Sequence, residues 1–219
     1  MNAPTGSEVY LPRGRRARKP SGDDRERDIL ITAERLLEHR SLHDISVDDL
    51  ARGAGISRPT FYFYFPSKEA VVLSLLDRVV EEARANRAAA LERAGDDAWE
   101  IWRDGLRAIH DTFRSHKALS RTAAQLFAEN PEVRSVWSVV MEGFVGDTVA
   151  GIESERARGA APDGPPAREL AIALNWMNER VFLASFTGQD PSIDEERVLD
   201  TLLTIWSRAI YAEDRLAGA

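Results

Sequence analysis

The residues of this sequence with the clearest chemical potential form one short run, Ser57-Arg58-Pro59-Thr60. An arginine can donate two parallel hydrogen bonds to guanine, and a threonine methyl group or a proline ring can contact the methyl group of thymine. Side chains in the first turn of a recognition helix reach such base edges. We therefore take Ser57, Arg58, Pro59 and Thr60 as candidates for reading DNA in the major groove.

Two capping patterns and a glycine place this run at the start of a short helix. Ser46 precedes Asp49 by three residues, the spacing of a capping box with Asp in place of Glu, which predicts a first helix. Gly55 supplies the left-handed conformation of a tight turn. Ser57 is a second N-cap, and Pro59 falls in the first helical turn, where its missing N–H costs nothing. The spacing predicts a helix-turn-helix with a recognition helix from about residue 58 to 64.

A β-strand is the alternative for the aromatic part of this segment. The run Phe61-Tyr-Phe-Tyr-Phe65 between two prolines has the highest β-propensity in the chain. A strand needs a partner, however, and no other alternating β-branched run bounded by turn residues occurs. The valines and isoleucines elsewhere stand at helical spacing, which favours the helix.

The charge of the chain is distributed unevenly. Residues 1–80 carry 13 Lys and Arg against 12 Asp and Glu, whereas residues 81–219 carry 16 against 24. Five basic residues, Arg15 and Arg16 among them, lie between residues 13 and 19 beside prolines and glycines. Such a segment buries too little apolar surface to fold alone. It is either an arm that contacts phosphates or the minor groove of DNA, or a solvated tail.

Helical periodicity continues through the rest of the chain. We predict an all-α protein of about nine helices, with an N-terminal three-helix head and a larger helical region. Breakers such as Asn130-Pro131 separate expected helices at about 97–115, 117–129, 132–158, 166–187 and 194–213. We divide the chain into a flexible basic arm (1–22), a helix-turn-helix domain (23–67) and a larger helical domain (68–219).

Residues 45–71 resemble the DNA-binding signature of the TetR family of one-component transcriptional regulators. Segments such as Leu76-Asp-Arg-Val-Val80 and Met177-Asn-Glu-Arg180 resemble the ethionamide-resistance branch of that family, and the resemblance extends from about residue 11 to 211. The hydroxyls of Tyr62 and Tyr64 and the amino group of Lys68 can reach phosphates, and the resemblance implies these same roles. It also implies a homodimer on a palindromic operator and a controlled neighbouring gene for a Baeyer–Villiger-type monooxygenase.

Two aromatic-rich faces of the larger domain have two interpretations. Taken alone, such stripes favour a packed core over a ligand pocket. The polar face at Asn175, Asn178 and Glu179 on an otherwise apolar helix favours a pocket, and the resemblance implies an elongated hydrophobic one. Where relatives have aromatic rings, this chain has Ile109, Asp147 and a different ring, Phe144. The candidate ligand-binding residues are Trp102, Ile109, Phe113, Trp137, Met141, Phe144, Asn175, Asn178, Glu179 and Trp206.

The last two expected helices present apolar residues at a spacing of three or four. These faces either belong to the core of the monomer or form a two-fold interface, as paired half-sites on DNA require. The resemblance implies a four-helix interface made from these helices of two subunits. The candidate interface residues are Leu174, Val181, Val198, Leu202 and Ile205.

Enzymatic signatures are missing from the sequence. There is no cysteine, and the four histidines have no acidic or cysteine companions at ligand spacing. No nucleotide-binding, P-loop or nucleophile-elbow motif occurs. We expect no catalytic residue, metal or cofactor, and a cytoplasmic protein without a membrane partner, since neither a signal peptide nor a spanning run is present. The expected function is a repressor that a hydrophobic small molecule releases from double-stranded operator DNA; the alternative is a helical carrier or cofactor-free enzyme that ignores DNA.

Overall fold

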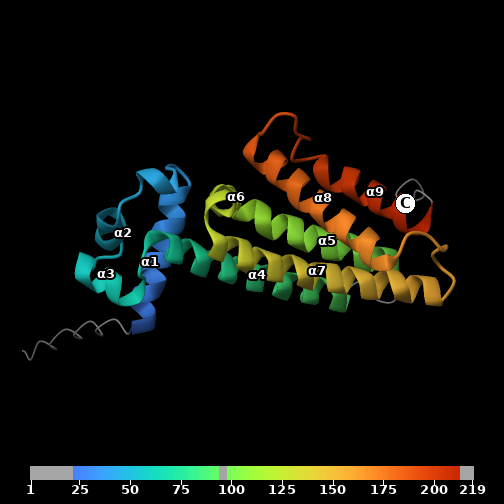
Figure 1. Cartoon of the computed structure of the whole chain (residues 1–219), viewed down its shortest axis with the longest axis horizontal. Coiled ribbons are helices and arrows are strands. Elements are labelled where there is room, and N and C mark those ends of the chain that lie inside the picture. Colours follow the sequence, from blue (N-terminus) through green and yellow to red (C-terminus); the bar gives the residue numbers. More distant parts are fainter. Residues whose placement is uncertain (1–21, 94–97, 213–219) are drawn as a thin grey trace, which may run out of the picture.

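The computed structural model describes residues 22–93 and 98–212. Within these residues all regular structure is helical, with nine α-helices and one short 3-10 turn, which confirms the predicted all-α class. The basic residues Arg15 and Arg16 of the expected arm lie outside the described residues. Figure 1 shows a small helical head at one end of the molecule and a bundle of longer helices that extends away from it.

The head contains the predicted caps. It consists of α1 (Gly22–Leu37), the turn η1 (Leu42–Asp44), α2 (Val47–Gly53) and α3 (Arg58–Tyr64). Ser46 Oγ accepts from the Asp49 N–H at 3.1 Å, and Asp49 Oδ2 accepts from the Ser46 N–H at 3.0 Å. Ser57 Oγ accepts from the Thr60 N–H at 3.3 Å, and Gly55 has a φ of +66°. The aromatic run is therefore helical, and the strand alternative is wrong.

A close approach between α1 and α2 fixes the shape of the head. A Cβ atom on Gly53 would lie 2.3 Å from Thr32 Cγ2, which is far inside van der Waals contact. Thr32 is itself buried, and Ile29, Leu50 and Phe61 form the core beside it. Glycine at residue 53 thus allows the two helices to meet, and their contact supports the recognition helix α3.

The bundle is built from six helices. These are α4 (Lys68–Arg93), α5 (Ala98–Ser115), α6 (Lys117–Glu129), α7 (Pro131–Ala157), α8 (Ala167–Thr187) and α9 (Val198–Tyr211). The observed α9 begins four residues later than the predicted 194, and the other bounds agree closely. In Figure 1, α8 and α9 lie together on one side of the bundle, and α4 lies on the opposite side.

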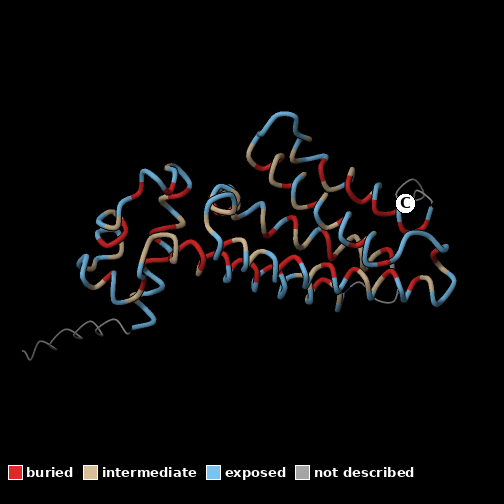
Figure 2. Tube along the Cα trace, in the orientation of Figure 1, coloured by how far each residue is buried: buried red, intermediate tan, exposed pale blue. Residues whose placement is uncertain are grey.

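Helix α4 belongs to both parts of the molecule. Its residues Val71 and Leu75 pack in the core of the head, whereas Leu76 and Val80 pack with Val140 of α7 in the bundle. Figure 2 shows the buried residues along the inner sides of these helices and the exposed ones on their outer sides. A single continuous helix therefore connects the head that carries the recognition helix with the interior of the bundle.

The structure corrects the predicted interface residues. Leu174, Val198 and Leu202 are at most 3% exposed and lie in the core of the bundle, and Val181 packs against that core. Only Ile205 of the five is exposed, at 40%. The sequence correctly identified apolar faces on α8 and α9, but these faces pack against the other helices of the same chain. The large apolar residues that α8 leaves exposed are Ile172 and Trp176.

Candidate nucleic-acid interface and internal pocket

The first turn of α3 lies on the surface of the head. Ser57, Arg58 and Pro59 are exposed, and Thr60 is half-buried. Phe61 of the same helix is fully buried and holds α3 to the head. The four predicted base-reading residues therefore lie together at the start of a short helix, and a ligand can approach them directly.

Arg58 is already held in a defined position. Its Nη1 donates to Asp48 Oδ2 at 3.0 Å, its Nη2 donates to the Tyr62 hydroxyl at 3.4 Å, and its guanidinium carbon lies 5.7 Å from the centre of the Tyr62 ring. The hydrogen bond with Tyr62 and the charge of Asp48 raise the pKa of Arg58. The guanidinium thus presents its donors to an oxygen acceptor, which a guanine edge or a phosphate also supplies.

Phe63 is an exposed aromatic residue on α3 that the sequence pattern did not single out. Phe63 is 83% exposed and its ring packs edge-on against Tyr64, with the ring centres 5.1 Å apart. A large apolar side chain so exposed beside polar ones is typical of a binding surface. The available signal was the helical register: with Phe61 and Phe65 facing inward, Phe63 must face outward. The Tyr64 ring is half-buried, and its hydroxyl lies near Gly22 at the start of α1.

Lys68 has a different environment from the one that the sequence predicted. Its Nζ donates to the backbone carbonyl oxygens of Leu42, His43 and Ile45 at 2.7, 3.3 and 3.1 Å. A lysine ammonium has three donors, so all of them are used within the head. Lys68 joins the start of α4 to the segment around η1, and in this structure it is not available to a phosphate. No pattern in the sequence indicated these long-range partners.

A cavity of about 440 Å³ lies inside the bundle. The wall includes all ten residues that the sequence predicted for ligand binding, and they come from α5, α7, α8 and α9. Residues that the prediction omitted also line it, among them Arg87 of α4 and Ala123 and Phe127 of α6. Further aromatic and polar wall residues are Asp147, Trp176, Phe182 and Phe186. Phe182 and Phe186, which are four residues apart on α8, could have been recognised from their helical spacing.

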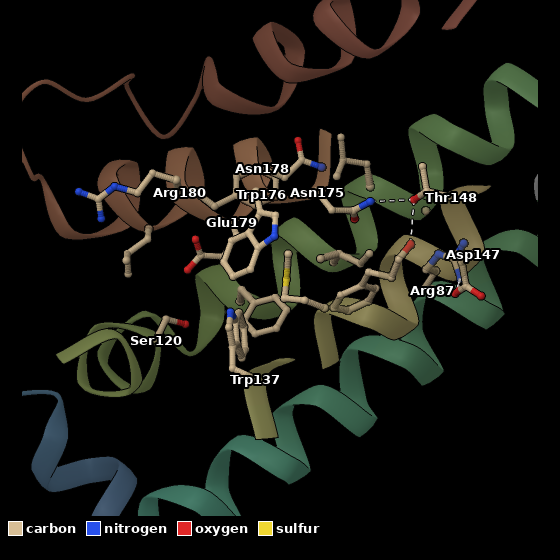
Figure 3. Close-up of a pocket in the computed structure, with 18 of the residues that line it drawn as sticks. Arg87, Ser120, Trp137, Asp147, Thr148, Asn175, Trp176, Asn178, Glu179 and Arg180 are labelled. Carbon is tan, nitrogen blue, oxygen red and sulfur yellow. Dashed lines mark hydrogen bonds and ion pairs between the residues drawn. The ribbon is translucent and has the colours of Figure 1, made fainter. Parts of the chain in front are cut away.

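Hydrogen bonds fix the amide side chains of the wall (Figure 3). Asn175 Nδ2 donates to Thr148 Oγ1 at 3.0 Å and to the Ala171 carbonyl at 2.9 Å. Asn178 Oδ1 accepts from Trp206 Nε1 at 3.0 Å. Among the described residues, nothing accepts from Asn178 Nδ2, which leaves a donor for a guest molecule. The two amides are thus oriented before any ligand arrives, which lowers the entropic cost of binding.

Charged groups occupy two separate parts of the wall (Figure 3). Arg87 Nη1 donates to Asp147 Oδ2 at 2.6 Å, and this ion pair joins α4 to α7. Glu179 of α8 lies on the other side of the drawn pocket. Burial raises the pKa of Glu179, and the charge of the neighbouring Arg180 opposes that shift. The carboxyl group therefore sits where its charged form is costly.

Residues 22–93 and 98–212 contain no group of three or more His, Cys, Asp or Glu side chains arranged to hold a metal ion. No helix in the same ranges combines the length and apolar character that crossing a membrane requires.

Known protein families match the head and the bundle separately. Residues 29–75 match the model of bacterial regulatory proteins of the tetR family, and residues 102–212 match that of the C-terminal domain of the transcriptional regulator EthR. The HTH-type transcriptional regulator EthR of Mycobacterium tuberculosis is 56% identical over 216 residues, 98% of this chain and 100% of that protein. EthR of Mycolicibacterium smegmatis is 48% identical over 207 residues, 94% and 95% of the two chains. These relatives are named regulators of transcription, not enzymes.

Solved structures share the fold. A TetR-like regulator from a Rhodococcus species superposes with a TM-score of 0.64 at 24% identity, over 96% of this chain and 100% of the other. A regulator from Saccharomonospora viridis in complex with choline gives a TM-score of 0.69 at 23% identity, over 82% and 94%. The resemblance that residues 45–71 suggested is confirmed, and the chain belongs to the TetR family of bacterial transcriptional regulators, among relatives of the EthR type.

Proposed function

We propose that this regulator is a repressor that binds a palindromic operator as a homodimer and leaves it when a hydrophobic small molecule fills the cavity. The observation that carries the proposal is the course of α4, which begins beside the recognition helix and lines the cavity with Leu76 and Arg87. In this scheme residues 1–22 are a basic arm, residues 23–67 bind DNA, and residues 68–219 bind the ligand and the second subunit.

DNA recognition falls to the exposed side of α3. Arg58, Pro59 and Thr60 would meet base edges, with Ser57 capping the helix that carries them. Tyr62 and Tyr64 would contact phosphates and fix the register, together with Arg15 and Arg16 of the arm. Lys68 would act indirectly, by holding α4 against the head.

A dimer follows from the size of the DNA-reading surface. One helix of seven residues reads only a few base pairs, so a specific site needs two recognition helices related by two-fold symmetry. The outer faces of α8 and α9 support this arrangement because Ile172 and Ile205 are 37% and 40% exposed. Large apolar side chains gathered on two neighbouring helices are typical of subunit interfaces.

The link between cavity and DNA is argued from α6 as well as α4. Ala123 and Phe127 of α6 line the cavity, while Arg121 Nη2 of the same helix donates to the Leu37 carbonyl of α1 at 3.2 Å. A guest that binds better to a conformer with misplaced recognition helices shifts the population toward that conformer. A structural relative in complex with choline supports the view that this fold can enclose a small molecule.

The proposed target gene is inferred from similarity to EthR and not from the geometry of the site. Similarity to EthR suggests a neighbouring gene for a Baeyer–Villiger-type monooxygenase, together with the gene of the regulator itself. The competing function is that of a helical carrier or cofactor-free enzyme, which would hold a small molecule without binding DNA.

Footprinting on the DNA that flanks the regulator's own gene tests the proposal. The wild-type protein should protect one palindromic site there. Arg58→Ala should lower affinity for that site by roughly tenfold or more, because a bidentate base contact contributes about 1–3 kcal/mol. Arg107→Ala is the matched control, since Arg107 is an exposed arginine of α5, far from the head. Protection that is absent in the wild type, or unchanged in Arg58→Ala, would favour the carrier.

A further inference from the structure

The cavity wall contains one carboxylate that stands apart from the others. Asp147, Glu155 and Glu179 all line the cavity. Asp147 is paired with Arg87 at 2.6 Å, and Glu155 is bound by Arg158 at 2.8 and 2.5 Å. Two of the three carboxylates are therefore neutralised by an arginine of the same chain.

Glu179 has no such partner among the described residues. The adjacent arginine, Arg180, donates from Nη2 to the Gln189 side-chain oxygen at 3.0 Å, so its guanidinium is drawn toward the loop after α8. Arg180 also lines the cavity, but in Figure 3 its guanidinium points away from the carboxyl group of Glu179. A half-buried carboxylate without a cation or a donor is costly, and a partner brought by a ligand removes that cost.

The surroundings of Glu179 suit a cation. Trp176 precedes Glu179 by three residues on α8, so both side chains lie on one face of the helix, and Trp137 of α7 also lines the cavity. The face of a tryptophan ring attracts a positive charge. The rest of the wall is mainly apolar and aromatic, including Phe113, which packs edge-on against Trp137 with the ring centres 6.1 Å apart.

We infer that the cavity selects amphiphilic amines, with the positively charged head group of the ligand bound by Glu179 beside Trp176 and the apolar chain enclosed by the aromatic wall. This inference deepens the proposed function and depends on the cavity being a ligand site. The cation supplies the missing partner of Glu179 and the charge attracted by the rings. A carboxylate head group in the same place would meet a like charge, and an alcohol would give Glu179 one hydrogen bond but no counterion.

Three probes with the same eight-carbon chain separate these cases. Calorimetric titration of the full-length protein at neutral pH is made with octylammonium, n-octanol and octanoate. Octylammonium should bind roughly tenfold to a hundredfold more tightly than n-octanol, because the ammonium adds an attraction between opposite charges to its hydrogen bond with Glu179. Octanoate should bind most weakly.

Substitutions locate the charge that causes the preference. Glu179→Gln keeps the shape of the side chain and should reduce octylammonium to the affinity of n-octanol, while n-octanol is bound as before. Glu153→Gln is the matched control because Glu153 is an exposed glutamate of α7 outside the cavity wall.

The outcomes distinguish this inference from the proposal beneath it. Equal binding of octylammonium and n-octanol overturns the selection of amines but leaves the cavity as a ligand site. A preference that survives in Glu179→Gln, or disappears in the Glu153→Gln control, also overturns the assignment. If none of the three probes binds, both the inference and the ligand-binding part of the proposed function fail.

Discussion

Arg58 illustrates how recognition is prepared at the scale of one side chain. Its guanidinium is held by Asp48 and Tyr62 before DNA arrives, so fewer rotamers are lost on binding. The Arg58–Asp48 ion pair is exposed on both sides, and exposed pairs contribute little to stability. A base edge or phosphate can therefore replace Asp48 at small cost.

The structure assigns Lys68 a stabilising role within the head, whereas the sequence pattern predicted a contact with phosphate. Lys68→Ala removes three hydrogen bonds to carbonyls and should lower the free energy of unfolding by about 1–3 kcal/mol. A lysine that contacted phosphate would instead reduce the salt slope of DNA binding by about one. We expect a lower unfolding midpoint in urea and a slope that changes by clearly less than one. A stable variant with a reduced slope would restore the phosphate role.

Asp49 should give the head a defined dependence on pH. Its pKa is lowered from 3.8 to about 2, mainly because the Ser46 backbone N–H donates to it and then because the Ser46 hydroxyl and Arg40 do so. A lowered pKa stabilises the folded state above the unfolded value, and that contribution is lost as the pH falls from about 4 toward 2. Asp49→Ala should therefore be less stable than the wild type at neutral pH, and the difference should shrink in acid. Asp77→Ala, at an exposed site of α4, serves as control; a difference that persists unchanged at low pH would contradict the capping role.

At the scale of elements, local signals were predictable and distant contacts were not. The caps at Ser46 and Ser57 and the turn at Gly55 depend on neighbours within three residues, so the sequence located α2 and α3 correctly. The Arg87–Asp147 pair joins residues sixty positions apart, and nothing in the sequence indicated it. Helical spacing also identified the apolar faces around Leu174 and Leu202 but not which surface covers them. The arrangement of the helices, and not their pattern, decided that these faces are core.

Helix α6 touches both the cavity and the head, which makes it the element most suited to couple them. Its first residues follow His116, which contacts Glu34 of α1 and lies 3.4 Å from Glu82 of α4. One turn further on, Arg121 binds the last turn of α1 through the Leu37 carbonyl. Movement of α6 in response to a guest would reach the head through these two contacts.

Arg121→Ala should weaken this coupling without changing either binding site. The side chain is exposed and lies outside the cavity wall, so n-octanol should bind with wild-type affinity. The effect of n-octanol on DNA binding should fall by about two- to thirtyfold, because coupling residues contribute about 0.5–2 kcal/mol. Operator binding measured with and without n-octanol decides the matter. Gln125→Ala, at another exposed site of α6, is the control, and full release in Arg121→Ala would exclude this route.

For the whole molecule, the outer faces of α8 and α9 should determine assembly. A charge at Ile172 or Ile205, introduced by Ile172→Lys or Ile205→Lys, would be buried in the proposed interface without a partner, which is strongly unfavourable. Sedimentation should then report monomers, and operator affinity should fall by at least tenfold. Val139→Lys changes an equally apolar, 67% exposed residue of α7 and should remain dimeric. Dimers in both Ile variants would direct attention to another face.

The close contact between Gly53 and Thr32 predicts how a substitution at residue 53 would behave beside a normal copy of the gene. A side chain at residue 53 would overlap the buried Thr32, so we expect α2 to move away from α1 and to displace the recognition helix with it. The outer faces of α8 and α9, at the far side of the bundle, would be unaffected. In the proposed homodimer, a Gly53→Ala chain would thus still pair with a normal one, and the mixed dimer would have only one correctly placed recognition helix. In a cell carrying both alleles, the mutant allele would be dominant.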